Sequence, residues 1–112
     1  MCNLALSLVV CMLLGSAGLS PALAPALPCA AAEHRAFDFW LGEWNVHAAN
    51  GKLAGTNSIK REHGGCVLHE RYDTARGYTG ERFNVYDASR KVWHQSWVDS
   101  DGLLLLLEGG IR

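Results

Sequence analysis

The chain has 112 residues, of which 49% are hydrophobic and 19% are charged, and its formal net charge is −1. This length predicts a single domain. Affinity for nucleic acid depends on concentrated Lys and Arg, so the near-neutral balance argues against a nucleic-acid partner. The charge is unevenly placed, because no Asp, Glu, Lys or Arg precedes Glu33.

The uncharged residues 1–32 are organised like an export signal. An apolar core over residues 4–14 is followed by three prolines, and Ala30-Ala31-Ala32 offers small residues for cleavage. We therefore predict a signal peptide over 1–32 and a mature domain over 33–112. The protein is expected to be periplasmic or secreted, with no stable membrane insertion after signal cleavage. An uncleaved anchor is the alternative, but the apolar core is short for a membrane span.

Three of the four cysteines precede the predicted cleavage site, and one follows it. Cys2, Cys11 and Cys29 are expected to leave with the signal, so the mature chain would keep only Cys66 and form no internal bridge. Lipidation is the alternative fate of Cys29, although the residues before it are not the small ones expected at such a site. Cys66 begins an apolar segment without a neighbouring base, which predicts a buried, unreactive thiol.

Six strands are predicted in the mature chain. A helical or 3₁₀ turn over residues 37–41 leads into the first strand. Asn50-Gly51 then tolerates the positive φ angles of a tight hairpin turn. Further Gly, Asp and Ser residues separate the later segments. The predicted strands are residues 44–48, 53–62, 66–72, 78–86, 91–98 and 103–107.

Short strands at regular spacing are typical of an all-β, antiparallel up-and-down sheet that curls towards a barrel. Residues 103–107 are all Leu, which predicts a strand covered on both faces. A closed barrel usually takes about eight strands or more, so about six predict an incomplete barrel with an open edge. We expect a C-terminally truncated form of a longer protein. Pairing of the open edge with another chain is the alternative.

The start of the domain is rich in aromatic rings. Residues 37–44 read Phe-Asp-Phe-Trp-Leu-Gly-Glu-Trp, with four aromatic rings in eight residues. Large rings gain most by burial, so we expect these side chains to plug the closed end of the barrel. A ligand-stacking role for Trp40 is the alternative.

Gly42-x-Trp44, after a helical turn, resembles the G-x-W signature of the lipocalin-like (calycin) barrels. The wider pattern resembles a lipocalin-like family of bacterial secreted proteins of unknown function, and the resemblance covers about residues 37–110. It implies a barrel with several further strands, and a small polar residue facing the cavity where this chain has Arg82. Besides residues 37–44, the blocks that carry it are Gly64-Gly65-Cys66-Val67-Leu68, Asn84-x-Tyr86-Asp87 and Trp93-x-Gln95-x-Trp97-Val98-Asp99.

Trp93, Gln95 and Trp97 alternate along one predicted strand and therefore share a face. Aromatic walls with one amide between them suit a small apolar or amphipathic molecule. Asn84, on the neighbouring strand, is expected to join them. An interior packed on itself is the alternative.

Glu70 shares strand parity with Leu68 and is expected to point inward towards Arg82. A buried carboxylate serves as an acid or base when its pKa is shifted, so Glu70 or His69 is the candidate base of a cyclase or isomerase. An ion pair is the alternative. No Ser-His-Asp spacing, phosphate loop or carboxylate pair is present, so we predict no catalytic residue.

The five histidines show no His-x-His or His-x₃-His pair, so we expect no metal site. Haem held by one His, as in some related ten-stranded barrels, is the remaining cofactor alternative. The leading hypothesis is an exported, non-catalytic binder of a small apolar or amphipathic ligand. An enzyme in the barrel mouth and a structural envelope protein that self-associates through its open edge are the alternatives. The predicted ligand-binding residues are Trp93, Gln95, Trp97, Asn84 and Glu70.

Overall fold

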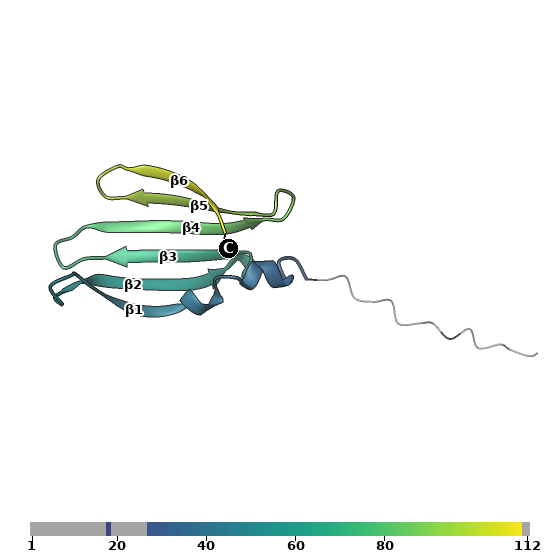
Figure 1. The fold of residues 1–112 in the computed structure, drawn as a ribbon, viewed down its shortest axis with the longest axis horizontal. Coiled ribbons are helices and arrows are strands. Elements are labelled where there is room, and N and C mark those ends of the chain that lie inside the picture. Colours follow the sequence, from purple (N-terminus) through teal and green to yellow (C-terminus); the bar gives the residue numbers. More distant parts are fainter. Residues whose placement is uncertain (1–17, 19–26, 111–112) are drawn as a thin grey trace, which may run out of the picture.

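The computed structural model describes Gly18 and residues 27–110, so most of the predicted signal peptide lies outside the described residues. The described part contains six strands and three short 3₁₀ helices (Figure 1). The helices are η1 (Ala32–Arg35), η2 (Asp38–Trp40) and η3 (His63–Gly65). The strands are β1 (Gly42–His47), β2 (Leu53–Glu62), β3 (Val67–Asp73), β4 (Thr79–Asp87), β5 (Val92–Asp99) and β6 (Leu104–Gly109).

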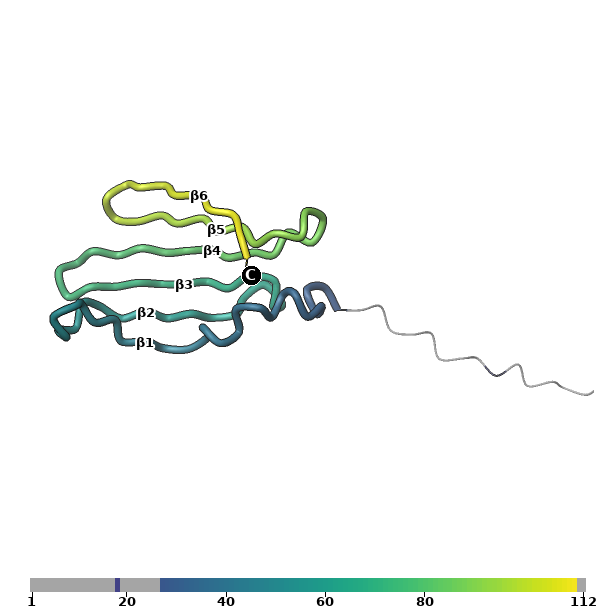
Figure 2. The backbone as a smooth tube through the Cα atoms, in the orientation of Figure 1, coloured from purple at the N-terminus to yellow at the C-terminus, as the bar shows by residue number. Residues whose placement is uncertain are grey.

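The strands form one sheet in the order β1-β2-β3-β4-β5-β6, and each is antiparallel to its neighbours (Figures 1 and 2). The predicted up-and-down sheet of six strands is therefore confirmed, with strand ends shifted by at most two residues. Among the described residues the sheet is open, with β1 and β6 at its two edges.

Turn chemistry explains where β1 ends and β2 begins. Gly51 adopts a φ of 80°, which favours glycine. The Asn50 side-chain oxygen accepts a hydrogen bond from Lys52 N at 2.9 Å, and Ala48 N donates to Lys52 O at 2.8 Å. These bonds close the β1–β2 hairpin at the predicted place.

The strand register collects one set of alternating side chains on a single face, which we call the inner face. Glu70 pairs with Arg82 and Arg82 with Trp97, while Asn84 pairs with Gln95. The predicted parity is thus confirmed. The opposite, outer face carries the intervening residues. Inner-face positions used below are Ile59, Leu68, Glu70, Arg82, Asn84, Tyr86, Trp93, Gln95, Trp97, Leu105 and Leu107.

The core lies at one end of the inner face. Ile59, Leu68 and Trp93 are buried there, and Phe37 and Trp40 pack against them from the N-terminal segment. The Phe37 and Trp93 rings meet edge to face, with centroids 4.9 Å apart. An ion pair between Asp38 of η2 and Arg61 of β2 fastens the same segment. This N-terminal cap, residues 32–41, covers one end of the sheet.

Two of the four rings expected to be buried are not. Phe39 is 71% exposed and Trp44 is 45% exposed, whereas Phe37 and Trp40 are partly buried. Trp44 lies on the edge strand β1, where the described residues provide no strand beyond it. Its Nε1 donates to Trp40 O at 2.7 Å instead of entering the core.

The expectation that residues 103–107 are covered on both faces is also wrong. These five leucines are between 40% and 62% exposed. The reason is that β6 is an edge strand whose only neighbour among the described strands is β5. A run of leucines shows that a segment is apolar, but not whether a partner covers it.

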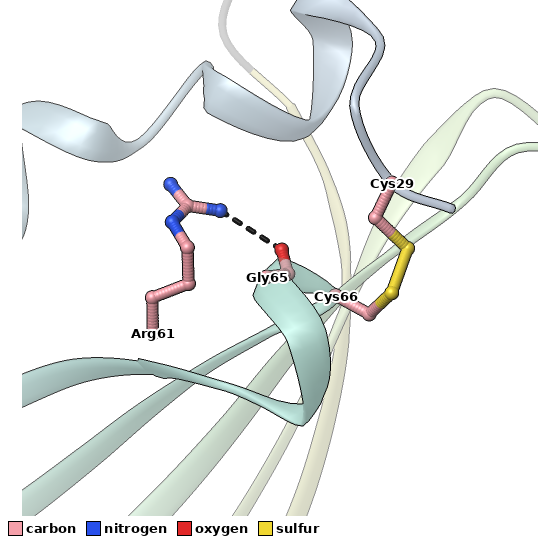
Figure 3. The surroundings of a disulfide bond; sticks show 4 residues. All are labelled: Cys29, Arg61, Gly65 and Cys66. Carbon is pink, nitrogen blue, oxygen red and sulfur yellow. Dashed lines mark hydrogen bonds between the residues drawn. A yellow bond between two sulfur atoms is a disulfide. The ribbon is translucent and has the colours of Figure 1, made fainter. Parts of the chain in front are cut away.

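A disulfide joins Cys29 to Cys66, which contradicts the expectation of a single free thiol (Figure 3). The η3 turn presents Cys66 to the segment before η1, and Gly64 and Gly65 adopt φ angles of 65° and 93° within it. Arg61 Nη1 donates to Gly65 O at 2.9 Å and supports the turn. A folded domain that keeps this bond includes Cys29 and so begins before residue 33.

Loss of this disulfide should destabilise the domain. The two cysteines are 37 residues apart, and opening a loop of this size costs about 4 kcal/mol on the chain-entropy account. We expect oxidised Cys66→Ser to unfold at a markedly lower urea concentration than the wild type. Adding reductant should bring the wild type down to the variant and leave the variant unchanged; equal midpoints before reduction would contradict this.

Candidate functional site

The inner face is hollowed where the N-terminal cap meets the sheet. One hollow of about 250 Å³ is lined by Phe37, Phe39, Trp40, Arg82, Asn84 and Gln95. A second of about 350 Å³ is lined by Phe37, Trp93, Gln95 and residues 107–110. Because both include Phe37 and Gln95, we treat them as one site and call it the inner hollow. Its wall is aromatic on the cap side. On the sheet side it is polar at Arg82, Asn84 and Gln95 and apolar at Trp93 and Leu107.

The lining residue Arg82 forms an ion pair with the buried Glu70. Glu70 is 7% exposed, and its Oε2 lies 3.4 Å from Arg82 Nε. Its other oxygen accepts a hydrogen bond from Asn57 Nδ2 at 2.9 Å. An unpaired carboxylate at this depth would be very unfavourable, so the two partners allow its burial. The predicted inward direction of Glu70 towards Arg82 is confirmed.

Arg82 is held between Glu70 and the ring of Trp97. Its guanidinium carbon lies 5.2 Å from the Trp97 ring centroid, within the range of a cation–π interaction. Arg82 is partly buried and lines the inner hollow. The arrangement presents a fixed cation beside the apolar cap.

The two amides of the site differ in accessibility. Asn84 is 2% exposed, and its Nδ2 donates to Leu68 O at 3.0 Å. It therefore fastens β4 to β3 as well as lining the hollow. Gln95 is only partly buried, lies opposite Asn84 and contributes to both parts of the hollow. Gln95 is the more available hydrogen-bonding group.

Asp99 positions Trp97 from the far end of β5. Asp99 Oδ2 accepts hydrogen bonds from Trp97 Nε1 at 3.1 Å and from Tyr78 OH at 2.8 Å. Its Oδ1 accepts from Asp101 N and Leu103 N in the following turn. Burial raises the pKa of Asp99, but these donors together outweigh that effect and leave it below the ordinary value.

The structure distributes the five predicted site residues over different positions. Asn84 and Gln95 line the hollow, and Trp93 lines its second part while belonging to the core. Trp97 and Glu70 support Arg82 and do not line the hollow. Phe37, Phe39 and Arg82 also line the hollow, although the sequence pattern does not mark them as binding residues. The shared strand parity of Arg82 and Asn84 is the one local signal that places Arg82 on this face.

The histidines of β3 and β5 lie on the outer face. His69 Nδ1 is 2.9 Å from Glu62 Oε2, its Nε2 is 3.3 Å from Glu81 Oε1, and its ring stacks on Phe83. His69 is thus separated by the sheet from Glu70, so the two do not share a pocket. Within residues 27–110 and Gly18, no three His, Cys, Asp or Glu side chains are arranged to hold a metal ion. The helices in this part are too short to span a membrane.

No family model, no curated protein and no solved structure matches this chain. The inner hollow is therefore the feature from which we infer a function.

Removing the Asp99 carboxylate should change the titration of Tyr78. The hydrogen bond to Asp99 raises the pKa of Tyr78 above its ordinary value of 10.0. Because the phenol holds its proton more tightly in the folded protein, this hydrogen bond adds to the free energy of unfolding. That contribution is complete below about pH 10 and is lost as the pH rises through the folded-state pKa of Tyr78. In Asp99→Asn we expect the Tyr78 pKa to fall towards the ordinary value.

The measurement is phenolate absorbance against pH, with Tyr78→Phe subtracted so that only this phenol is followed. A Tyr78 midpoint that is the same with Asp and Asn at position 99 would contradict the hydrogen-bond account.

The Trp97 ring occupies the space beside Gly80, where any other residue would have a side chain. A Cβ built on Gly80 would overlap the Trp97 ring, and Gly80 is buried. We expect Gly80→Ala to displace the ring and lower stability by about 1–3 kcal/mol, the usual cost of overpacking. The matched control is Gly109→Ala, because nothing lies within 4 Å of a Cβ built there. Near-ultraviolet circular dichroism and urea unfolding should change only in the first variant; equal effects would contradict the assignment.

Proposed function

We propose that this protein is an exported, non-catalytic, lipocalin-like binder of a small amphipathic molecule, which it holds in the inner hollow. The observation that carries the proposal is the pairing of an aromatic cap with a fixed cation and an available amide around one cavity. Small-molecule sites combine predominantly apolar walls with a few placed polar groups. An apolar tail would contact Phe37, Phe39 and Trp40, while its polar end would face Arg82 and Gln95.

The exposure of Phe39 supports this role. Phe39 is 71% exposed although it lies beside the hollow, so its ring gains little from packing in the free protein. A bound tail would cover it and add apolar contact area. Aromatic side chains commonly serve as such contacts because they bury a large surface with few rotatable bonds.

An exported location is supported by the Cys29–Cys66 bond. Disulfides form and persist mainly in oxidising compartments such as the periplasm and the extracellular space. The apolar segment over residues 4–14 gives the same indication from the sequence. Both observations support our proposal that the protein functions in the periplasm or outside the cell.

The lipocalin-like assignment is supported by topology. The strands follow one another in an up-and-down antiparallel order, and a 3₁₀ turn precedes Gly42 and Trp44 on β1. Such a sheet, curled further, encloses a single ligand. In this account the described sheet forms one wall of the binding site.

A cyclase or isomerase using Glu70 is less well supported. Glu70 meets Arg82 with one oxygen and Asn57 with the other, and it does not line the hollow. A general base must reach the proton that it removes. His69, the other candidate, lies on the outer face.

Truncation of Phe39 tests the proposed site directly. We expect Phe39→Ala to weaken binding of decanol, a small amphiphile, about tenfold, which corresponds to about 1.4 kcal/mol of lost apolar contact. The melting temperature should hardly change because the ring is mostly exposed. The control is Phe83→Ala on the outer face, which should leave affinity unchanged. Binding is followed by tryptophan fluorescence; decanol affinity that is unaffected by Phe39→Ala would count against the site.

Natural ligand chemistry is tested by incubating the oxidised protein with a bacterial lipid extract and identifying what co-purifies. The proposal predicts recovery of amphiphiles by the wild type and less by Phe39→Ala. Recovery of nothing, together with unchanged tryptophan fluorescence, would oppose the binding function itself.

A further inference from the structure

Asn84 has a buried side-chain oxygen for which the described residues provide no donor. Its Nδ2 donates to Leu68 O at 3.0 Å, whereas its Oδ1 accepts no hydrogen bond from the part of the chain that the structure describes. The side chain is 2% exposed, so bulk water scarcely reaches it. A buried acceptor without a donor is unfavourable, and few native side chains keep one. This oxygen therefore calls for a donor from outside the protein.

The position of Asn84 places this oxygen beside the inner hollow. Asn84 lines the hollow and lies on β4, which is paired with β3 on one side and with β5 on the other. Asn57 Oδ1 is a second buried amide oxygen that lacks a donor among the described residues, but Asn57 does not line the hollow. Of these two amides, Asn84 is thus the one against which a bound molecule would lie.

Two further polar groups lie beside Asn84 on the same wall. Gln95 is its direct partner on β5, and side chains paired in this way have Cβ atoms about 4.5–5.5 Å apart. Arg82 precedes Asn84 by two residues on β4 and shares its face, at a Cα separation of about 6–7 Å. All three residues line the hollow. One small polar head group can therefore contact the three together.

The charges at this wall favour a neutral head group. Arg82 Nε lies 3.4 Å from Glu70 Oε2, so the two side chains together carry no net charge. Glu70 is 7% exposed, and an anionic head group bound at Arg82 would bring a second negative charge beside this buried carboxylate. Like charges in such a setting are unfavourable. The other N–H groups of the Arg82 guanidinium can still donate to an uncharged oxygen.

We infer that the ligand of the inner hollow is a neutral amphiphile with a hydroxyl head group, which donates a hydrogen bond to Asn84 Oδ1. The same hydroxyl oxygen accepts a hydrogen bond from Arg82 or Gln95. This inference rests on the proposed binding function and adds the chemistry of the head group to it. An ionised carboxylate and an ether oxygen have no proton to donate, so neither satisfies Asn84. Asn84 is therefore the residue that selects among amphiphiles of equal length.

Two isomeric ligands separate hydrogen-bond donation from apolar contact. Decanol and 1-methoxynonane contain the same atoms in chains of similar length, but only decanol has a hydroxyl group. We expect the oxidised wild type to bind decanol about tenfold more tightly than 1-methoxynonane, because the ether leaves Asn84 Oδ1 without a donor. Decanoate, which is ionised at pH 7, should also bind more weakly than decanol. Tryptophan fluorescence at pH 7 measures the three affinities.

A pair of variants tests whether Asn84 makes this distinction. In Asn84→Ala, decanol and 1-methoxynonane should bind with nearly equal affinity, because neither ligand then meets the acceptor. Gln95→Leu is the matched change at the opposed position on β5, and it should keep the preference for decanol. Circular dichroism checks that each variant keeps its sheet. If Asn84→Ala does not fold, because Asn84 also fastens β4 to β3, the affinity ratio of the wild type and that of Gln95→Leu decide.

The possible outcomes distinguish the head-group inference from the binding function. Equal affinity of the wild type for decanol and 1-methoxynonane, or tighter binding of decanoate than of decanol, would overturn the inference and leave the binding function standing. Survival of the preference in a folded Asn84→Ala variant, or its loss in Gln95→Leu, would do the same. Failure of the wild type to bind any of the three compounds would contradict the binding function, and the inference with it.

Discussion

The edge-to-face contact between Phe37 and Trp93 holds the two parts of this molecule together. It joins the N-terminal cap to β5 at a centroid distance of 4.9 Å. Among the described residues, Ile59 and Leu68 are the other buried apolar residues of the core beside it. A six-stranded sheet with so small a core needs the cap to cover its apolar end. The cap also supplies the aromatic wall of the inner hollow, so stability and the proposed binding function depend on the same contact.

Two further bonds tie the N-terminal segment to the sheet. The Cys29–Cys66 disulfide joins the residues before the cap to the turn after β2, and the ion pair between Asp38 and Arg61 joins the cap to β2. Both restrain a short segment that has little regular structure of its own. On the sheet side, Glu70 and Trp97 hold Arg82 in the same way. Phe37 and Arg82, which line the hollow, are thus held in place in the free protein, and this reduces the entropy lost on binding.

Local patterns predicted the sheet well and its tertiary neighbours poorly. Turn residues at Asn50-Gly51 and 63–65 bounded β2, and alternation placed Gln95 and Asn84 on one face, because strand parity is a local property. The exposure of residues 103–107 and the pairing of Cys29 depend on which segments meet in space. Parity with Asn84 predicts the face of the sheet on which Arg82 lies, but the position of the cap opposite that face is a tertiary contact that no local pattern shows.

In the proposed function, the cap and the inner face together form one binding site. The most direct measurement is a nuclear magnetic resonance titration of the oxidised protein with decanol. The account predicts that the largest shifts fall on the Gln95 side-chain amide and the Phe39 ring, while His94 and Ser96 on the outer face stay in place. Shifts concentrated on the outer face, or spread evenly over the sheet, would contradict it.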